Sequence, residues 1–223
     1  MQALVIGATG AIGRYLVAEL LQHASVASVH TVTRREYVLP EDCAVGETDL
    51  GKLTQHVIAD LNAETLRQHP NMFQGTSHGF CCLGTTRADA GSEEAFLAVD
   101  KHLVLAFAEL LKDSGSPSLS LVSSQGAKAN SWFLYMRTKG EVEEACRQLA
   151  FEHCDIYRPG LLGRGKDART KEKIVGLFTS KMPVHTVANP MLYHALGASS
   201  PAGYRIWYNR DIKRAAKDLE AVN

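Results

Sequence analysis

The sequence lacks long apolar runs and blocks of like charge. No stretch approaches the roughly 20 apolar residues that cross a bilayer, so we expect no membrane span. A strand-like run begins at Gln2, which leaves no room for a signal or transit peptide, and the cytoplasm is the expected compartment. Lysine plus arginine and aspartate plus glutamate each total 24, so the formal net charge is zero. A neutral chain without a basic block gives no support to binding of nucleic acid or anionic membranes.

Signatures of disulfides and metal sites are also missing. The five cysteines are odd in number and form no CxxC pair, so we expect reduced thiols. Cys81 and Cys82 lie in an apolar run, which favours burial as small hydrophobic residues over reactivity. The nine histidines are scattered and form no HExxH pattern. The sequence therefore predicts no metal site.

Short apolar segments alternate with helical patterns along the chain, which is typical of a parallel sheet wrapped by helices. We predict an α/β protein with a doubly wound, mostly parallel Rossmann sheet. It forms one NAD(P)-binding domain over residues 1–223, in which residues 161–203 are a smaller substrate-side region at the C-terminal side. The expected strands are residues 3–6, 29–33, 56–60, 79–83, 119–123, 154–158 and 204–208.

A glycine-rich loop follows the first expected strand. It reads VIGATGAIGRYL and places Gly7, Gly10 and Gly13 in a G-x-x-G-x-x-G pattern where a helix begins. Such a loop turns tightly and lets a pyrophosphate approach the backbone, and the helix N-terminus offers free N–H groups to the phosphates. Because the pattern lies at the first strand-to-helix junction, it predicts a dinucleotide site rather than the alternative, a purely structural turn.

Two arginines end the second expected strand. Sites that prefer NAD carry an acidic residue about 20 positions after the glycines, where it holds the ribose 2′-hydroxyl. Arg34 and Arg35 stand there instead, and Glu36 follows one or two positions late. Arginine suits a 2′-phosphate, so we predict NADP in preference to NAD. The alternative is a solvated pair at the end of a strand.

Tyr135 and Lys139 are four residues apart in a helical pattern, and Ser123 and Ser124 end the fifth expected strand. Open parallel sheets bind ligands at this edge. A free tyrosine, with a pKa of about 10, is a poor proton shuttle at neutral pH, and a neighbouring ammonium lowers that pKa. Tyr135 and Lys139 could therefore be a proton donor and its tuning cation. The alternative is an ordinary pair on a helix surface.

This combination of glycine loop, serine, tyrosine and lysine resembles the short-chain dehydrogenases/reductases over nearly the whole chain. The spacing of the glycines is similar to that of the extended and atypical branches. Three segments resemble the Tat-interacting-protein oxidoreductases, which are small atypical members with a bound NADPH. The segments are FCCLGTTR (80–87), SSQGAKANSWFLYMRTKGEVE (123–143) and YRPGLL (157–162).

The resemblance implies hydride transfer between the nicotinamide and a carbonyl or alcohol carbon. Tyr135 would move the proton, Lys139 would also hydrogen-bond the nicotinamide ribose, and Ser124, with Ser123 as its neighbour, would polarise the substrate oxygen. The residues implied for the cofactor are Thr9, Gly10, Ala11 and Ile12 in the phosphate loop, Arg34 and Arg35 at the 2′-phosphate, Leu83 and Gly84 after the fourth strand, and Leu162 and Arg169 after the RPG turn.

Two positions depart from the pattern of the superfamily. Ser124 lies only eleven residues before Tyr135, and Asp100 follows Val99 where many extended members carry an asparagine. The proton relay that the asparagine supports elsewhere is therefore expected to differ.

A second hypothesis is a regulatory module that binds NADPH and contacts protein partners with little or no turnover. The substrate, the reaction direction and the choice between monomer and homodimer stay open.

Overall fold

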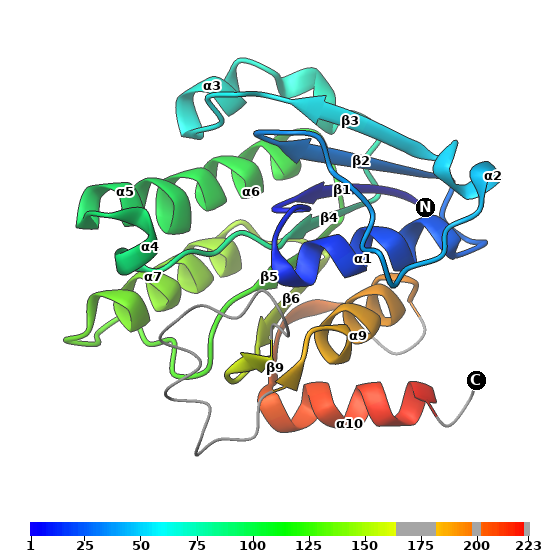
Figure 1. Cartoon of the computed structure of the whole chain (residues 1–223). Helices are drawn as coiled ribbons and strands as arrows, with labels where there is room; N and C mark the ends of the chain where they lie inside the picture. The colour runs from blue at the N-terminus through cyan, green and yellow to red at the C-terminus, as the bar shows by residue number, and fades with distance from the viewer. Residues whose placement is uncertain (164–181, 198–201, 221–223) are drawn as a thin grey trace.

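Seven strands form one sheet in the computed structural model, which describes residues 1–163, 182–197 and 202–220. Their spatial order is β3-β2-β1-β4-β5-β6-β9, and each neighbouring pair is parallel. The predicted doubly wound sheet is confirmed (Figure 1). The strands are β1 (Gln2–Ile6), β2 (Ser28–Thr33), β3 (Leu53–Val57), β4 (His78–Cys81), β5 (Ser118–Val122), β6 (His153–Arg158) and β9 (Gly203–Tyr208).

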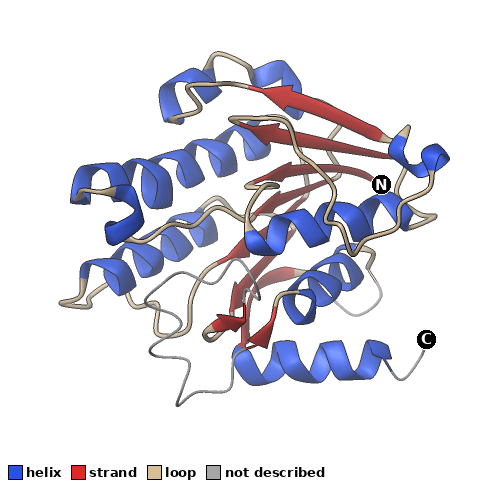
Figure 2. Ribbon diagram, viewed as in Figure 1, coloured by secondary structure: helices blue, strands red, loops and turns tan. Residues whose placement is uncertain are grey.

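Helices cover both faces of the sheet (Figure 2). On one face α1 packs against α9, which in turn contacts α10, and on the other face α3 and α7 flank α6. The described helices are α1 (Ala11–Gln22), α2 (Glu47–Leu50), α3 (Ala63–Arg67), η1 (Pro70–Phe73), α4 (Arg87–Ala90), α5 (Glu93–Leu97), η2 (Ala98–Leu103), α6 (Val104–Asp113), α7 (Leu134–Gln148), α9 (His185–Ala195) and α10 (Asn209–Glu220). None of the described helices is long and apolar enough to cross a bilayer.

The strand β1 shows how the sequence divides the core. Successive side chains of a strand point to opposite faces of the sheet. Ala3 and Val5 accordingly join the cluster under α1 and α9, whereas Leu4 and Ile6 join the cluster under α6 and α7. Because both faces are covered, the strand is apolar at each of these positions rather than alternating with polar residues.

The strand β3 lies three residues earlier than predicted. An apolar run predicts a strand over residues 56–60, but the strand spans Leu53–Val57 and, among the described strands, pairs only with β2 at the edge of the sheet. An edge strand with half-exposed side chains needs no continuous apolar run. The apolar residue Ile58 instead follows the strand and packs against the core from the loop.

The range 161–203 contains a crossover helix of the main sheet. A short two-stranded sheet pairs β7 (Leu162–Gly163) with β8 (Met182–Pro183), and α9 follows. The helix α9 lies between β6 and β9 in the chain and packs on α1. The parts of this range at 164–181 and 198–201 lie outside the described residues.

Aromatic rings stack where β9 and α9 meet β6. The Trp207 ring lies over His194 with centroids 3.8 Å apart, and its Nε1 donates to Asp155 Oδ1 at 2.8 Å. The Tyr157 hydroxyl pairs with His194 Nδ1 at 2.9 Å. These contacts attach the last strand and its crossover helix to the rest of the sheet.

Candidate functional site

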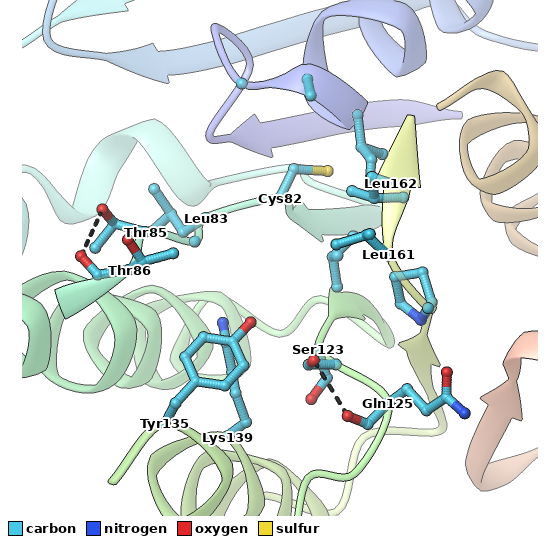
Figure 3. A pocket seen from close by; sticks show the side chains of 18 of the residues that line it. Cys82, Leu83, Thr85, Thr86, Ser123, Gln125, Tyr135, Lys139, Leu161 and Leu162 are labelled. Atoms are coloured by element: carbon cyan, nitrogen blue, oxygen red, sulfur yellow. Dashed lines mark hydrogen bonds between the residues drawn. The ribbon is translucent and has the colours of Figure 1, made fainter. Parts of the chain in front are cut away.

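A cavity of about 710 Å³ opens at the carboxyl ends of β1, β4 and β5. The chain leaves β1 toward β2 on one side and returns to β4 on the other, which makes this edge the ligand-binding position of an open parallel sheet. Figure 3 shows side chains from the two sides of this cavity. The lining residues comprise Thr9–Ile12, Arg14, Arg35, Cys82–Thr86, Val122–Gln125, Tyr135, Lys139 and Pro159–Leu162.

The glycine loop forms one end of the cavity with its backbone. Gly7 has a φ of +82°, and a Cβ atom there would lie 2.6 Å from the carbonyl carbon of Cys82. A Cβ at Gly13 would lie 2.2 Å from the carbonyl oxygen of Gly7, so the first turn of α1 passes directly over the loop. Real Cβ atoms do not approach backbone this closely, which means that this loop requires glycine at both positions. The geometry fits a loop that brings its backbone against a phosphate.

The N-terminus of α1 faces the same end. Gly10 is its N-cap residue, and in this fully described helix neither a side-chain cap nor an acidic residue occupies the first turn. The first N–H groups of a helix have no partner within the helix and carry a partial positive charge. Thr9, Gly10, Ala11 and Ile12, the residues that the resemblance implies for the phosphate loop, line the cavity here.

Two arginines line this end, but only one of them was predicted. Arg35 is exposed and belongs to the lining, together with Arg14 from the first turn of α1. Arg34 is also exposed and is not among the lining residues of the described chain. Arg14 was missed, although its position directly after Gly13 marks it as a residue beside the phosphate loop.

The helix α7 brings Tyr135 and Lys139 to the opposite end. Both side chains point into the cavity in Figure 3, as expected for residues four apart on one helix face. The Tyr135 ring packs against Phe96 with centroids 5.9 Å apart. Lys139 is only 3% exposed, which sets it apart from an ordinary surface lysine.

Lys139 has a buried partner in Asp100. Its Nζ lies 2.9 Å from Asp100 Oδ1, and Asp100 is fully buried. Burial lowers the pKa of Lys139, but the Asp100 carboxylate and the neighbouring Tyr135 raise it more, and the net pKa is raised. The ammonium is therefore charged at neutral pH. The other carboxylate oxygen, Oδ2, accepts the backbone N–H of Thr85 at 2.8 Å.

The two serines have different environments, although both line the cavity. The Ser123 hydroxyl donates to Glu143 Oε1, and Arg158 Nε donates to both oxygens of the same carboxylate at 2.9 and 3.2 Å. Ser123 is thereby committed to a buried acid–base network. The Ser124 hydroxyl has a longer contact of 3.4 Å with the carbonyl oxygen of Gln125. Ser124 is thus better placed to contact a substrate oxygen.

The remaining predicted residues fall on two sides of the cavity. Leu83 and Gly84 follow β4 and line one side, and Leu162 begins β7 on the other (Figure 3). Arg169 lies outside the described residues.

The cysteines are free thiols, and burial raises the pKa of Cys81 to about 12. That thiol is protonated and inert at neutral pH. In the described part of the chain, no cluster of three or more histidine, cysteine, aspartate or glutamate side chains is arranged to hold a metal ion.

The segment before α7 is unusually exposed for apolar residues. Trp132 is 97% exposed and Phe133 is 72% exposed. They precede Tyr135 by three and two residues. Large exposed apolar side chains grouped together are uncommon on a protein surface and are often functional.

A family model described as "NAD dependent epimerase/dehydratase family" matches residues 3–150, which is more than half of the chain. The chain belongs to this family. The matched region contains the glycine loop and both residues of the Tyr135–Lys139 pair.

Two curated relatives are similar to this chain over most of its length. Protein HTATIP2 of Rattus norvegicus is 36% identical over 227 residues, which cover 97% of this chain and 89% of the relative. The resemblance to the Tat-interacting-protein oxidoreductases, stated from three sequence segments, is thereby confirmed. The protein named fmp52, mitochondrial, of Emericella nidulans is 34% identical over 80% of this chain and 74% of its own length.

Solved structures share the fold at low sequence identity. MoeE5 in complex with UDP-glucose and NAD superposes with a TM-score of 0.69 at 17% identity, over 99% of this chain and 82% of that chain. The short-chain dehydrogenase/reductase YIR035C of Saccharomyces cerevisiae gives a TM-score of 0.66 at 16% identity, over 97% and 98% of the two chains. These similarities establish the Rossmann-like fold.

Proposed function

We propose that the protein is an NADP(H)-dependent oxidoreductase that acts on a small carbonyl or alcohol substrate. One observation carries the proposal: Tyr135 and the buried, charged Lys139 face the same cavity as the glycine loop of a family named for NAD. A surface pair would have neither the burial nor the shared cavity.

The chain's own residues account for the proton chemistry. Tyr135 would give a proton to the substrate oxygen in reduction and take it back in oxidation, while the Lys139 ammonium stabilises the phenolate form. Ser124 would hold the same oxygen by a hydrogen bond. A bound nicotinamide dinucleotide would supply or accept the hydride. MoeE5, which shares the fold, has been solved in complex with NAD, and this supports a nicotinamide dinucleotide as the class of cofactor.

The preference for NADP rests on the charge at the glycine-loop end. Arg14 and Arg35 line the cavity there. A guanidinium group pairs well with a phosphate. Unlike the carboxylate of sites that prefer NAD, it cannot accept a hydrogen bond from a ribose 2′-hydroxyl. The arginines therefore support NADP. The pair that supports it is Arg14 and Arg35, whereas the sequence predicted Arg34 and Arg35.

The catalytic proposal is tested by replacing the phenol. Tyr135→Phe should reduce turnover of a carbonyl panel with NADPH by about 10²- to 10⁴-fold while NADPH binding persists. The matched control is Tyr208→Phe, the same change at an exposed tyrosine at the end of β9, which should leave turnover unchanged. Equal rates of wild type and Tyr135→Phe across the panel would remove the enzyme assignment.

A second candidate function is an NADPH-dependent regulator that binds a protein partner. The exposed Trp132 and Phe133 favour it, because they offer an apolar contact surface beside the site. Such a regulator would bind NADPH with no turnover that depends on Tyr135. The comparison of wild type with Tyr135→Phe thus separates the two functions.

A further inference from the structure

We propose that Asp100 is a positioning residue. It fixes the Lys139 ammonium beside Tyr135 and thereby sets the pH at which the Tyr135–Lys139 pair loses its first proton. The inference rests on the proposed function, because it concerns the same site. Asp100 is fully buried, with Oδ1 2.9 Å from Lys139 Nζ and Oδ2 2.8 Å from the Thr85 backbone nitrogen.

A local irregularity of the helix carries Asp100 into the site. Between α5 and α6 the chain forms η2, a π-helical turn over Ala98–Leu103, in which Asp100 and Leu103 are buried. π-helical turns are rare and occur frequently at functional sites, because they change the direction in which side chains leave the helix. Here the turn places a carboxylate between α7 and the loop that follows β4.

The carboxylate connects two sides of the cavity. Lys139 belongs to α7, whereas Thr85 belongs to the loop that contains Leu83 and Gly84. A Cβ atom at Gly84 would lie 3.8 Å from Lys139 Nζ and 3.9 Å from Asp100 Oδ1, so this loop passes close to the ion pair. Asp100 therefore positions the catalytic cation and the loop against each other.

A purely structural role does not require a buried pair at this place. The same two helical elements are already joined near the surface by Lys101 and Glu141, whose Nζ and Oε2 atoms are 2.7 Å apart. Burying two charges is expensive, and an apolar pair of similar size is often as stable. The charge at Asp100 is therefore best explained by its effect on Lys139.

The charges around Lys139 determine the direction of that effect. Asp100 faces it from η2, Tyr135 from its own helix α7, and the protonated Cys81 thiol from β4. With Asp100 ionised, Lys139 charged and Tyr135 protonated, the group is neutral, and losing a proton makes it negative. Without the Asp100 charge, the same loss takes the pair from positive to neutral, which is easier. With Lys139 still charged, the first proton to leave the Tyr135–Lys139 pair is the one on the Tyr135 phenol, and it should then leave at lower pH.

The test compares Asp100→Asn with Glu141→Gln. The asparagine keeps an acceptor for Thr85 and loses the charge, and the control removes the surface ion pair between the same elements. The phenol of Tyr135 is titrated by ultraviolet difference absorbance, with Tyr135→Phe in each background subtracted, and this needs no turnover. Asp100→Asn should titrate at lower pH than wild type, whereas Glu141→Gln should not.

Kinetics give a second readout. In alcohol oxidation, where Tyr135 acts as the base, the rising limb of the pH–rate profile of Asp100→Asn should move to lower pH. Its kcat at neutral pH should fall about 10- to 100-fold because the ammonium stays beside Tyr135 but is no longer held in one position, while KM for the cofactor changes less. Unchanged titration in Asp100→Asn, or equal shifts in both variants, would overturn the proposal. If wild type shows no turnover, the proposed function fails, and the absorbance titration still decides the role of Asp100.

A double-mutant cycle covers the case in which Asp100→Asn folds poorly. The single change leaves a buried ammonium without its partner, whereas Asp100→Asn combined with Lys139→Gln removes both charges. The double variant should recover part of the stability that the single variants lose in urea unfolding. Strictly additive losses would show that Asp100 and Lys139 are not coupled and would also overturn the proposal.

Discussion

The two ends of the cavity are built by different means. At the glycine-loop end, backbone lies against backbone, and Gly7 and Gly13 leave no space for a Cβ atom. At the Tyr135 end, two ion pairs hold side chains in position: the buried Asp100–Lys139 pair, and the Glu143–Arg158 pair, in which Arg158 is partly exposed. The first end is limited by sterics and the second by electrostatics. The first should therefore respond to added volume, and the second to changes in charge and pH.

A substitution at Gly13 tests the steric limit at the glycine-loop end most directly. Gly13→Ala should cost about 4 kcal/mol of unfolding free energy and abolish dinucleotide binding, because the new Cβ meets the carbonyl oxygen of Gly7. Urea unfolding and NADPH titration measure both effects. Gly91→Ala is the control: its φ is +90°, but no atom of the described residues lies within 4 Å of the Cβ, so backbone strain alone should cost about 2 kcal/mol. Similar costs for the two variants would contradict the steric account.

At the other end, the corresponding change is Arg158→Met. The variant leaves the Glu143 side chain, which is 3% exposed, without its guanidinium partner, and should lose about 3 kcal/mol. Combining it with Glu143→Gln removes the uncompensated charge and should restore part of that loss in urea unfolding. A double variant no more stable than the single one would show that charge does not govern this end.

The pH range for comparing the two ends is limited by His78. Burial, with a smaller contribution from His153, lowers the pKa of His78 to about 3, and its Nε2 pairs with Ser120 Oγ at 2.9 Å. Between this value and the unfolded pKa of about 6.5, the unfolded chain binds more protons than the folded one, so stability falls as pH falls. Unfolding free energy should drop by about 2 kcal/mol between about pH 7.5 and about pH 5 from this group.

Denaturant unfolding at a series of pH values measures this slope. His78→Gln keeps a side chain that can pair with Ser120 but does not titrate, so its stability should depend less on pH over the same range. An unchanged slope would exclude His78 as the source. The two ends of the cavity are best compared above about pH 7.5, where His78 is almost entirely neutral in both states.

The smallest effect separates the two arginines at the glycine-loop end. Arg35→Ala should weaken NADPH binding roughly fivefold and leave NADH binding nearly unchanged, because an exposed charge contact with a phosphate is modest. Arg34→Ala is the matched control and should have less effect, since Arg34 is outside the described lining. Fluorescence titration with both dinucleotides measures the difference. Equal effects on NADPH and NADH would count against a 2′-phosphate contact.

Sequence patterns predicted the features that depend on neighbours in the chain. The glycine loop occupies one strand-to-helix junction, and Tyr135 and Lys139 share one turn of α7, so their spacing alone brought each set together. The apolar runs located all seven strands of the main sheet, with β3 displaced because an edge strand needs no buried run.

Features that depend on tertiary contacts were harder to predict. From the sequence, Asp100 is only a replacement for the asparagine that many extended members carry. Nothing local indicates that a π-helical turn directs its side chain to Lys139. Ser123 and Ser124 look equivalent in sequence, and the contact of Ser123 with Glu143 distinguishes them. Arg34 and Arg35 are adjacent, but consecutive residues at a strand end point in different directions, and only Arg35 belongs to the lining.

The exposure of Trp132 has an optical consequence. The chain has two tryptophans, and their environments differ: Trp132 is almost fully in solvent near the site, whereas Trp207 is partly buried, stacked on His194 and bonded to Asp155. A soluble quencher should therefore reduce the emission of Trp132 more than that of Trp207. The wild-type protein thus carries two separable fluorophores, one that reports events beside Tyr135 and one that reports the integrity of the last strand.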